Sequence, residues 1–236
     1  MSAGQYLRGA FIEFTESFPI PIPNVILFQY NPETMTHTWT PAQTGGANTP
    51  GQTASNPLAV TGPPEESFSF TIMMDAGDTI ADGSVVTAGL AEISGVYTRL
   101  AALEMLLFPT APPGGGLVGS ISSALGLSGP PAPSTSVPAS QLPTVLFVWG
   151  PGRIAPVRVT TLTITEKLFD GTLLVPTHAE AQLGLKVLTP AELAFVDGPL
   201  GTLANMASTY TTGLREALAI ANLANSVESI IGMLPV

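Results

Sequence analysis

Cysteine is absent from this chain of 236 residues. Its absence excludes disulfide bonds, thiolate nucleophiles and zinc sites that use cysteine. Long hydrophobic runs are also missing: no stretch of eighteen or more apolar residues occurs, so no membrane-spanning helix is predicted. The segment Met1–Tyr6 lacks a basic region followed by a hydrophobic one, so a secretory signal is not expected.

Charge is scarce as well. Only 24 of the 236 residues are Asp, Glu, Lys or Arg, whereas about one residue in four is typical. Two long blocks, Thr34–Pro64 and Met105–Gly152, carry no charged residue. Because an isolated soluble domain normally covers itself with charge, we predict that much of this surface faces other protein. The composition therefore favours a component of an assembly over a solitary enzyme.

Basic residues are the rarer of the two signs. Seven Lys and Arg stand against 17 Asp and Glu, which gives a net charge of −10. The only lysines are Lys167 and Lys186, and no basic cluster occurs. Binding to nucleic acid through counterion release needs several basic side chains on one face. We therefore expect no nucleic-acid partner.

The pattern of apolar residues predicts a mainly β protein. The segment 25–30 is almost continuously apolar, which is typical of a strand buried on both faces. In 157–165 the apolar phase slips, so a β-bulge is expected near Thr160–Thr161. Asp170-Gly171 is a turn signal. Period-two or continuous apolar runs predict strands at 10–14, 25–30, 35–40, 67–75, 144–149, 157–165 and 177–188.

Two stretches change to helical periodicity. One apolar stripe predicts a single helix over about 84–108, with Ser84 as its N-cap and Pro109 as its stop. Two further stripes predict a C-terminal helix over about 202–231 that is buried on two sides, either on a neighbour or folded back on the sheet. The expected organisation is a β domain over 1–190, with long loops at 41–65 and 109–143, and a helical extension over 191–236.

Residues capable of chemistry do not form a recognisable constellation. His37 shares a strand face with large residues and is expected to be a packed or hydrogen-bonded core histidine. His178 lies on the outward face of its strand and is expected to be solvent-exposed. Asp75–Asp82 faintly resembles a calcium loop, but Val86 occupies the position that requires a bidentate Glu. We predict no catalytic residue, no cofactor and no metal, and hence no enzyme.

Seven residues are candidates for contacts between subunits. Four are charges among apolar strands, and they fit either protection of strand edges or ion pairs between subunits equally well. The other three lie on the C-terminal helix. The candidates are Arg153, Arg158, Glu166, Lys167, Tyr210, Leu214 and Leu218.

Several segments, taken in order, resemble a known family. They are Leu27–Thr34, Phe68–Ile72 followed by Asp75, Leu100–Pro109, Val145–Gly150, Val157–Thr160, Ile164–Asp170 and Ala179–Leu188. Together they are similar to the N-terminal domain of contractile injection system tube proteins, the tube-initiator or spike-adaptor subunits in the baseplates of phage-tail-like particles. The similarity spans about Val25 to Leu193.

The resemblance implies a fold and a function. It implies antiparallel strands closed into a barrel or sandwich of the phage-tail-tube type, with one helix alongside. It also implies a hexameric ring that links the spike or hub to the inner tube, templates tube polymerisation and assembles in the cytoplasm as part of an injection particle. Some relatives carry a C-terminal peptidoglycan-binding LysM module, but the helical pattern of 190–236 does not predict one here.

Two other functions remain open at the level of sequence. The first is a β-sandwich module that binds a carbohydrate or another surface ligand, which would need an exposed aromatic platform. The second is a hydrolase whose acidic pair is dispersed along the chain.

Overall fold

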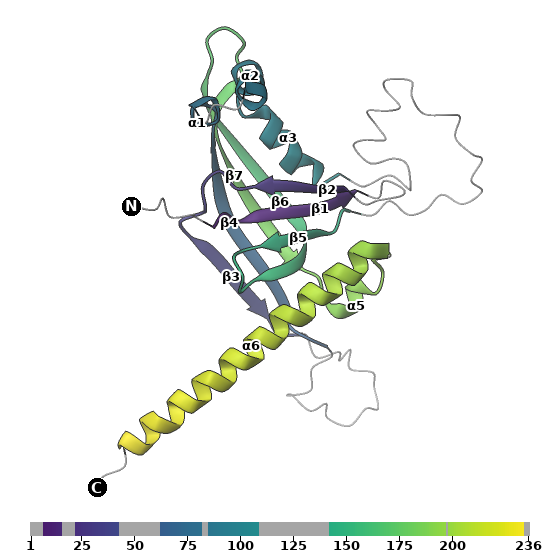
Figure 1. The fold of residues 1–236 in the computed structure, drawn as a ribbon, viewed down its shortest axis with the longest axis vertical. Coiled ribbons are helices and arrows are strands. Elements are labelled where there is room, and N and C mark those ends of the chain that lie inside the picture. Colours follow the sequence, from purple (N-terminus) through teal and green to yellow (C-terminus); the bar gives the residue numbers. More distant parts are fainter. Residues whose placement is uncertain are drawn as a thin grey trace, which may run out of the picture.

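The computed structural model describes residues 7–15, 22–42, 62–81, 85–108, 142–196 and 198–233. The protein is mainly β, as predicted (Figure 1). Its strands are β1 (Ala10–Thr15), β2 (Ile22–Leu27), β3 (Met35–Thr40), β4 (Glu65–Asp75), β5 (Val145–Val148), β6 (Ile154–Phe169) and β7 (Pro176–Val187). Its helices are α1 (Ala76–Ala81), α2 (Val85–Ser94), α3 (Tyr97–Met105), α5 (Pro190–Leu193) and α6 (Gly198–Met233).

The strands form one antiparallel sheet with the order β2-β1-β5-β6-β7-β4-β3. Within the described residues β2 pairs only with β1, and β3 pairs only with β4. The predicted barrel or sandwich is therefore wrong, because the two edge strands form no ladder with each other and there is no second sheet in this part of the chain. Alternation of apolar residues shows which face of a strand is buried, but it does not show whether a sheet closes.

The sheet is nevertheless strongly curved around an aromatic core. Phe11 on β1 and Phe70 on β4 have ring centroids 6.4 Å apart, although three strands separate them in the sheet. Phe28 and Phe147 lie between them and are almost fully buried. The curvature thus brings the inner face of the sheet onto itself, and the aromatic rings fill the space enclosed.

A side chain spans the gap that the open sheet leaves. The Gln29 side chain donates from Nε2 to the Asp75 carbonyl oxygen at 2.9 Å, and its Oε1 accepts from the Asp75 backbone N–H at 3.0 Å. Arg99 of α3 also donates to Gln29 Oε1, at 2.7 Å. The amide of Gln29 therefore gives the end of β4 the two hydrogen bonds that a neighbouring strand would supply.

The predicted helix over 84–108 is two helices, α2 and α3, and this prediction is wrong in its continuity. The chain bends at Gly95, whose φ is +56°, and the Val96 N–H donates to the Pro176 carbonyl oxygen at 3.0 Å. A Cβ at Gly95 would lie 2.2 Å from that oxygen. The apolar spacing in the sequence runs through the bend, but burial does not follow it: Leu100 and Leu103 of α3 are buried, whereas Ile93 of α2 is 68% exposed. Periodicity alone therefore does not reveal the break.

The long β6–β7 hairpin carries several confirmed predictions. The bulge lies between Val159 and Thr161, and a turn follows Asp170. The apolar side chains that alternate along the predicted strand β7 are buried: Ala179, Ala181, Leu183 and Leu185.

The strand predicted at 25–30 is present in part, but its predicted burial on both faces is wrong. The observed strand, β2, covers Ile22–Leu27 and lies at the sheet edge, where Val25 is 47% and Leu27 58% exposed. An apolar run is typical of an interior strand, but here a position at the edge of the sheet overrides that pattern.

The C-terminal helix is confirmed, and it packs on the sheet (Figure 1). Ala204 and Ala207 of α6 join Leu146, Leu188 and Leu193 in a second apolar cluster, separate from the aromatic core. The predicted loops at 41–65 and 109–143 lie largely outside the described residues, and β4 already begins at Glu65.

Candidate functional site

A charged cluster fastens α6 to one edge of the sheet. The Glu66 carboxylate is 5% exposed and accepts two hydrogen bonds from the Arg215 guanidinium, one of them 2.9 Å long from Nη1 to Oε2. His37 Nε2 lies 2.8 Å from Glu66 Oε1. Arg215 also covers the ring of Trp39, 4.7 Å from its centroid. Because Trp39 and Glu66 are opposite each other in the β3–β4 pair, one arginine holds both strands; we call Glu66, His37, Trp39 and Arg215 the α6 clasp.

The prediction from the sequence is right for His37 and wrong for His178. His37 stacks on Phe68 with centroids 4.4 Å apart, which confirms a packed, hydrogen-bonded residue. His178 is not solvent-exposed as predicted: its side chain is 19% exposed and its Nδ1 lies 3.4 Å from Asp75 Oδ2. The correction follows from register, since His178 lies directly opposite Asp75 in the β4–β7 pair.

The four charged interface candidates have different environments. Arg153 lies over the Phe68 ring, 5.0 Å from its centroid, and so contributes to packing within the chain. Lys167 pairs with Glu180, and this hydrogen bond lowers the pKa of the Glu180 carboxyl. Arg158 and Glu166 are exposed. All four lie on or beside β6, but the structure does not gather them into one site.

The C-terminal end of β7 holds a further group of ion pairs that the sequence did not indicate. Lys186 pairs with Glu65 of β4 at 2.9 Å and with Glu192 of α5 at 3.0 Å, and these contacts raise the pKa of the lysine. Its cross-strand neighbour in β6 is Arg158. Lys186 thus ties α5, the element that leads into α6, to the strand that carries the clasp carboxylate.

Over 201–222, where its side chains are described, the helix α6 is buried on one side, not on two. Its buried positions carry small side chains: Gly201, Ala204, Ala207 and Thr211. Small side chains let the helix backbone approach the sheet closely, so the large apolar residues point elsewhere. Those that remain exposed are Leu203 (38%), Met206 (64%), Tyr210 (50%), Leu218 (62%) and Ile220 (69%).

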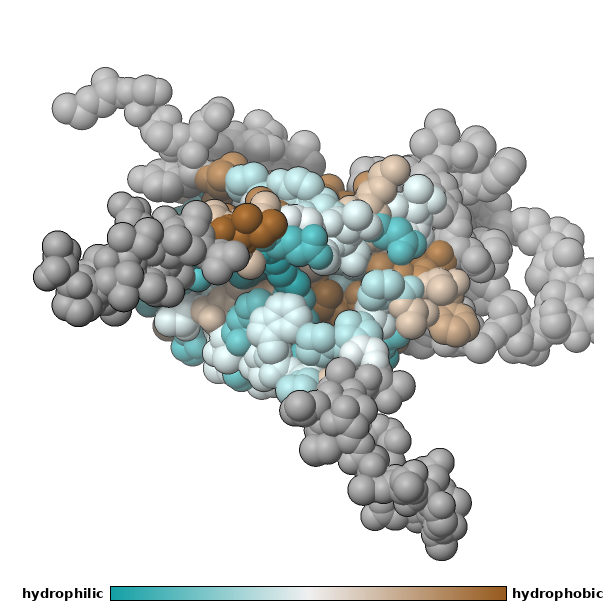
Figure 2. Space-filling view, turned by 90° about the horizontal axis from the view of Figure 1, so that it is seen from below, coloured by the Kyte–Doolittle hydropathy of each residue, from teal (hydrophilic) through white to brown (hydrophobic). Residues whose placement is uncertain are grey.

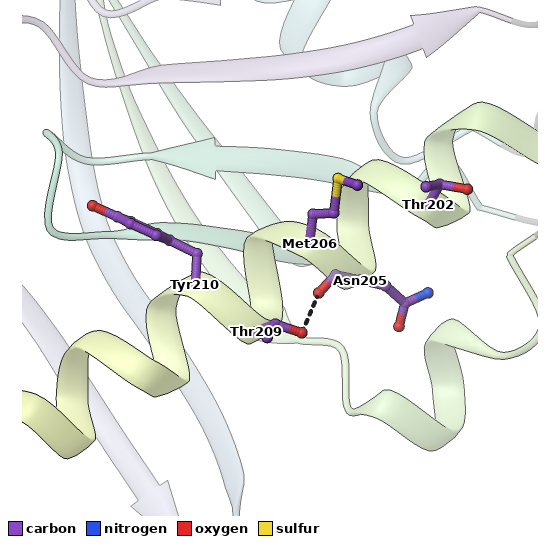
Figure 3. A pocket seen from close by; sticks show the side chains of 5 residues that line it. All are labelled: Thr202, Asn205, Met206, Thr209 and Tyr210. Atoms are coloured by element: carbon purple, nitrogen blue, oxygen red, sulfur yellow. Dashed lines mark hydrogen bonds between the residues drawn. The ribbon is translucent and has the colours of Figure 1, made fainter.

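The exposed side of α6 contains a shallow hollow (Figure 3). The described residues that line it all belong to this helix: Thr202, Asn205, Met206, Thr209 and Tyr210. None is charged, and the Tyr210 hydroxyl donates to the Pro151 carbonyl oxygen at 2.8 Å. From below, separate hydrophobic patches alternate with pale, weakly polar surface (Figure 2). Of the three interface candidates predicted on this helix, Tyr210 and Leu218 are exposed and Leu214 is half-buried.

The tip of the β6–β7 hairpin is the second exposed apolar feature. Leu168 and Leu174 adopt positive φ values of 51° and 55° and are 73% and 71% exposed. Asp170 accepts hydrogen bonds from the backbone N–H groups of Leu173 and Thr172 at 2.8 Å each, which lowers the pKa of its carboxyl. Sequence reasoning found the turn but missed the apolar tip. The signal was present in the large residues on both sides of Asp170-Gly171.

Among the described residues no group of three or more His, Cys, Asp or Glu side chains is arranged to hold a metal ion. No helix in the same part of the chain is long and apolar enough to cross a membrane. No protein-family model and no curated protein matches this chain.

Proposed function

We propose that this chain is a structural baseplate subunit of a contractile injection system. Six copies form a ring that links the spike or hub to the inner tube, and the ring templates polymerisation of the tube. The subunit is not an enzyme and assembles in the cytoplasm. The proposal is supported by the ordered sequence resemblance, the scarcity of charge and, above all, the two open edges of the sheet.

The open edges are the observation that carries the proposal. β2 and β3 each contain six residues, and neither contains an Asp, Glu, Lys or Arg. Proteins commonly guard exposed sheet edges with charged side chains or proline; β3 has neither, and β2 has only Pro23. Two unlike edges suit a head-to-tail contact, in which β2 of one copy lies beside β3 of the next, and such contacts close into rings when the rotation permits.

The carbohydrate-binding alternative gains no support from the two tryptophans. It needs an open aromatic platform, and the chain has two tryptophans. The Arg215 guanidinium covers the Trp39 ring, and Trp149 stacks on Phe147 with centroids 6.1 Å apart. Both rings are engaged within the chain.

Native mass spectrometry and electron microscopy test the ring directly. The purified chain should yield a species of about 146 kDa, six times its 24.3 kDa mass, and ring-shaped particles. The double variant Val25→Lys with Leu27→Lys places charge on the β2 edge. We expect this variant to remain folded and to lose the ring.

The matched control is Ile93→Lys on α2, since Ile93 is 68% exposed and apolar but lies on no sheet edge. This control should keep the ring. A wild-type chain that stays monomeric at high concentration, or a ring that survives the β2 substitutions, would contradict the proposal.

A further inference from the structure

The outer face of α6 carries a repeat with the spacing of a coiled coil. Apolar or small residues recur at alternating steps of three and four, which is the a/d pattern of a heptad. The positions in the described part of the helix are Leu203, Met206, Tyr210, Gly213, Ala217 and Ile220. By sequence the same spacing continues through Ala224, Val227 and Ile231, within the bounds of α6. We call these nine positions the α6 seam.

The seam lies opposite the side of α6 that the sheet covers. At 100° per residue, Met206 and Ala217 project about 120–160° from the buried Ala204 and Thr211. Every seam position from 203 to 220 is exposed. The fold of a single chain therefore buries the small-residue face of this helix, whereas the heptad face stays exposed and is held only at Tyr210, whose hydroxyl donates to the Pro151 carbonyl oxygen in the described part of the chain.

We propose that the seam packs against the same seam of other copies of this chain, in a parallel bundle of α6 helices. A heptad repeat sustained over three to four repeats is the signature of helices that pack on one another. Residues 203–231 span four repeats and about 42 Å of helix at ~1.5 Å per residue. A partner must present the same repeat over the same length, and a second α6 does so.

Charge and side-chain size agree with an identical partner. The chain has a net charge of −10, so copies repel one another unless they meet through a neutral face. No seam position is Asp, Glu, Lys, Arg or His, and Arg215 points to Glu66 on the sheet side. Gly213, Ala217 and Ala224 are small, which permits close approach of the helix backbones midway along the seam.

The parallel direction rests on the proposed function, because cyclic symmetry places equivalent helices parallel around one axis. Leu214 and Ala221 on one side of the seam and Leu223 on the other are apolar, whereas Glu216 and Glu228 are charged flanking positions. A helix with apolar flanks can contact two neighbours at once, as a closed ring of helices requires. The bundle would thus reinforce a ring whose other contacts are the sheet edges.

The lack of cysteine makes a crosslinking test clean. In a parallel bundle identical seam residues face each other, so Ile220→Cys should form disulfide-linked dimers when the assembled protein is oxidised. The matched control is Ala219→Cys, which is equally exposed but lies about 100° away around the helix. We expect at least tenfold faster crosslinking for Ile220→Cys.

A second variant addresses assembly. Met206→Asp with Ile220→Asp should leave the circular dichroism spectrum unchanged, because both side chains are largely exposed, and should weaken self-association at least tenfold. Equal or absent crosslinking of the two cysteine variants overturns the bundle. Preferred crosslinking between Met206→Cys and Ile220→Cys chains overturns the parallel direction. Rings that form without the Ile220→Cys crosslink refute the bundle alone, whereas crosslinked helices without a ring refute the proposed function alone.

Discussion

Replacing Arg215 with methionine is expected to loosen α6 from the sheet. Methionine keeps much of the aliphatic length of arginine but removes both hydrogen bonds to Glu66. It also removes the cation over the Trp39 ring. The Glu66 carboxylate, 5% exposed, then retains only His37 as its charged or polar partner in the clasp.

The magnitude follows from burial. Removing one member of a fully buried ion pair costs about 3–5 kcal/mol. Here the Arg215 side chain is 36% exposed and His37 still contacts the carboxylate, so water and the histidine recover part of the loss. We expect Arg215→Met to lower the free energy of unfolding by about 2–3 kcal/mol, of which the lost cation–π contact is roughly 0.5–1 kcal/mol.

Urea denaturation followed by circular dichroism and tryptophan fluorescence measures this change. Arg158→Met is the matched control, since Arg158 is exposed on β6, and it should change stability by less than about 0.5 kcal/mol. Adding Glu66→Gln to Arg215→Met should cost less than the sum of the single variants, with a coupling energy of about 1–2 kcal/mol. Additive effects, or a loss of under about 0.5 kcal/mol for Arg215→Met, would refute the clasp as a fastening of α6.

Three further predictions follow from single positions. Gly95→Ala should destabilise the fold by at least about 2 kcal/mol, because φ is +56° and the added Cβ would lie 2.2 Å from a backbone oxygen. The control Gly89→Ala, at a position with open space around it, should be neutral or stabilising by up to ~1 kcal/mol. Equal melting temperatures for the two variants would contradict this prediction. Phe147→Ala should cost about 3–5 kcal/mol in denaturant titrations, since its ring is fully buried, and a loss below ~1 kcal/mol would be incompatible with an aromatic core. The hydrogen bond to Asp78 raises the pKa of Tyr30 to about 12. This hydrogen bond therefore stabilises the fold fully below the ordinary tyrosine pKa of about 10, and its contribution disappears as pH rises towards 12. Ultraviolet titration should show one late-ionising tyrosine that Tyr30→Phe removes, and persistence of the late ionisation in that variant would disprove the assignment.

The bulge in β6 and the break between α2 and α3 show what local sequence can and cannot predict. The bulge between Val159 and Thr161 was predictable because a bulge shifts the alternation of buried residues, and that shift is written in the sequence. The break at Gly95 was not, because the apolar spacing in the sequence runs from Leu90 and Ile93 to Leu100 and Leu103 without interruption. The decisive contact there is a carbonyl oxygen of Pro176, which is 81 positions later in the chain.

Some residues of the candidate site were also predicted from the sequence, and others were not. Tyr210 and Leu218 were predicted as contacts between subunits; both are exposed, and their part in an interface stays a prediction. The clasp was not predicted, because Arg215 and Glu66 are far apart in sequence and neither belongs to a recognisable motif. The apolar hairpin tip at Leu168 and Leu174 was also missed, since a turn signal does not say whether the large residues beside it fold inward.

The amino-acid sequence by itself determined the elements that depend on local periodicity: a mainly antiparallel set of strands, a long C-terminal helix and a surface poor in charge. Only the tertiary structure decided whether the sheet closes and which side of α6 is covered. Both outcomes depend on contacts between distant segments, such as Gln29 with Asp75 at the gap in the sheet and Ala204 with the second apolar cluster. Local patterns record how each segment divides into apolar and polar faces, whereas the partner of each face is set by how the whole chain packs.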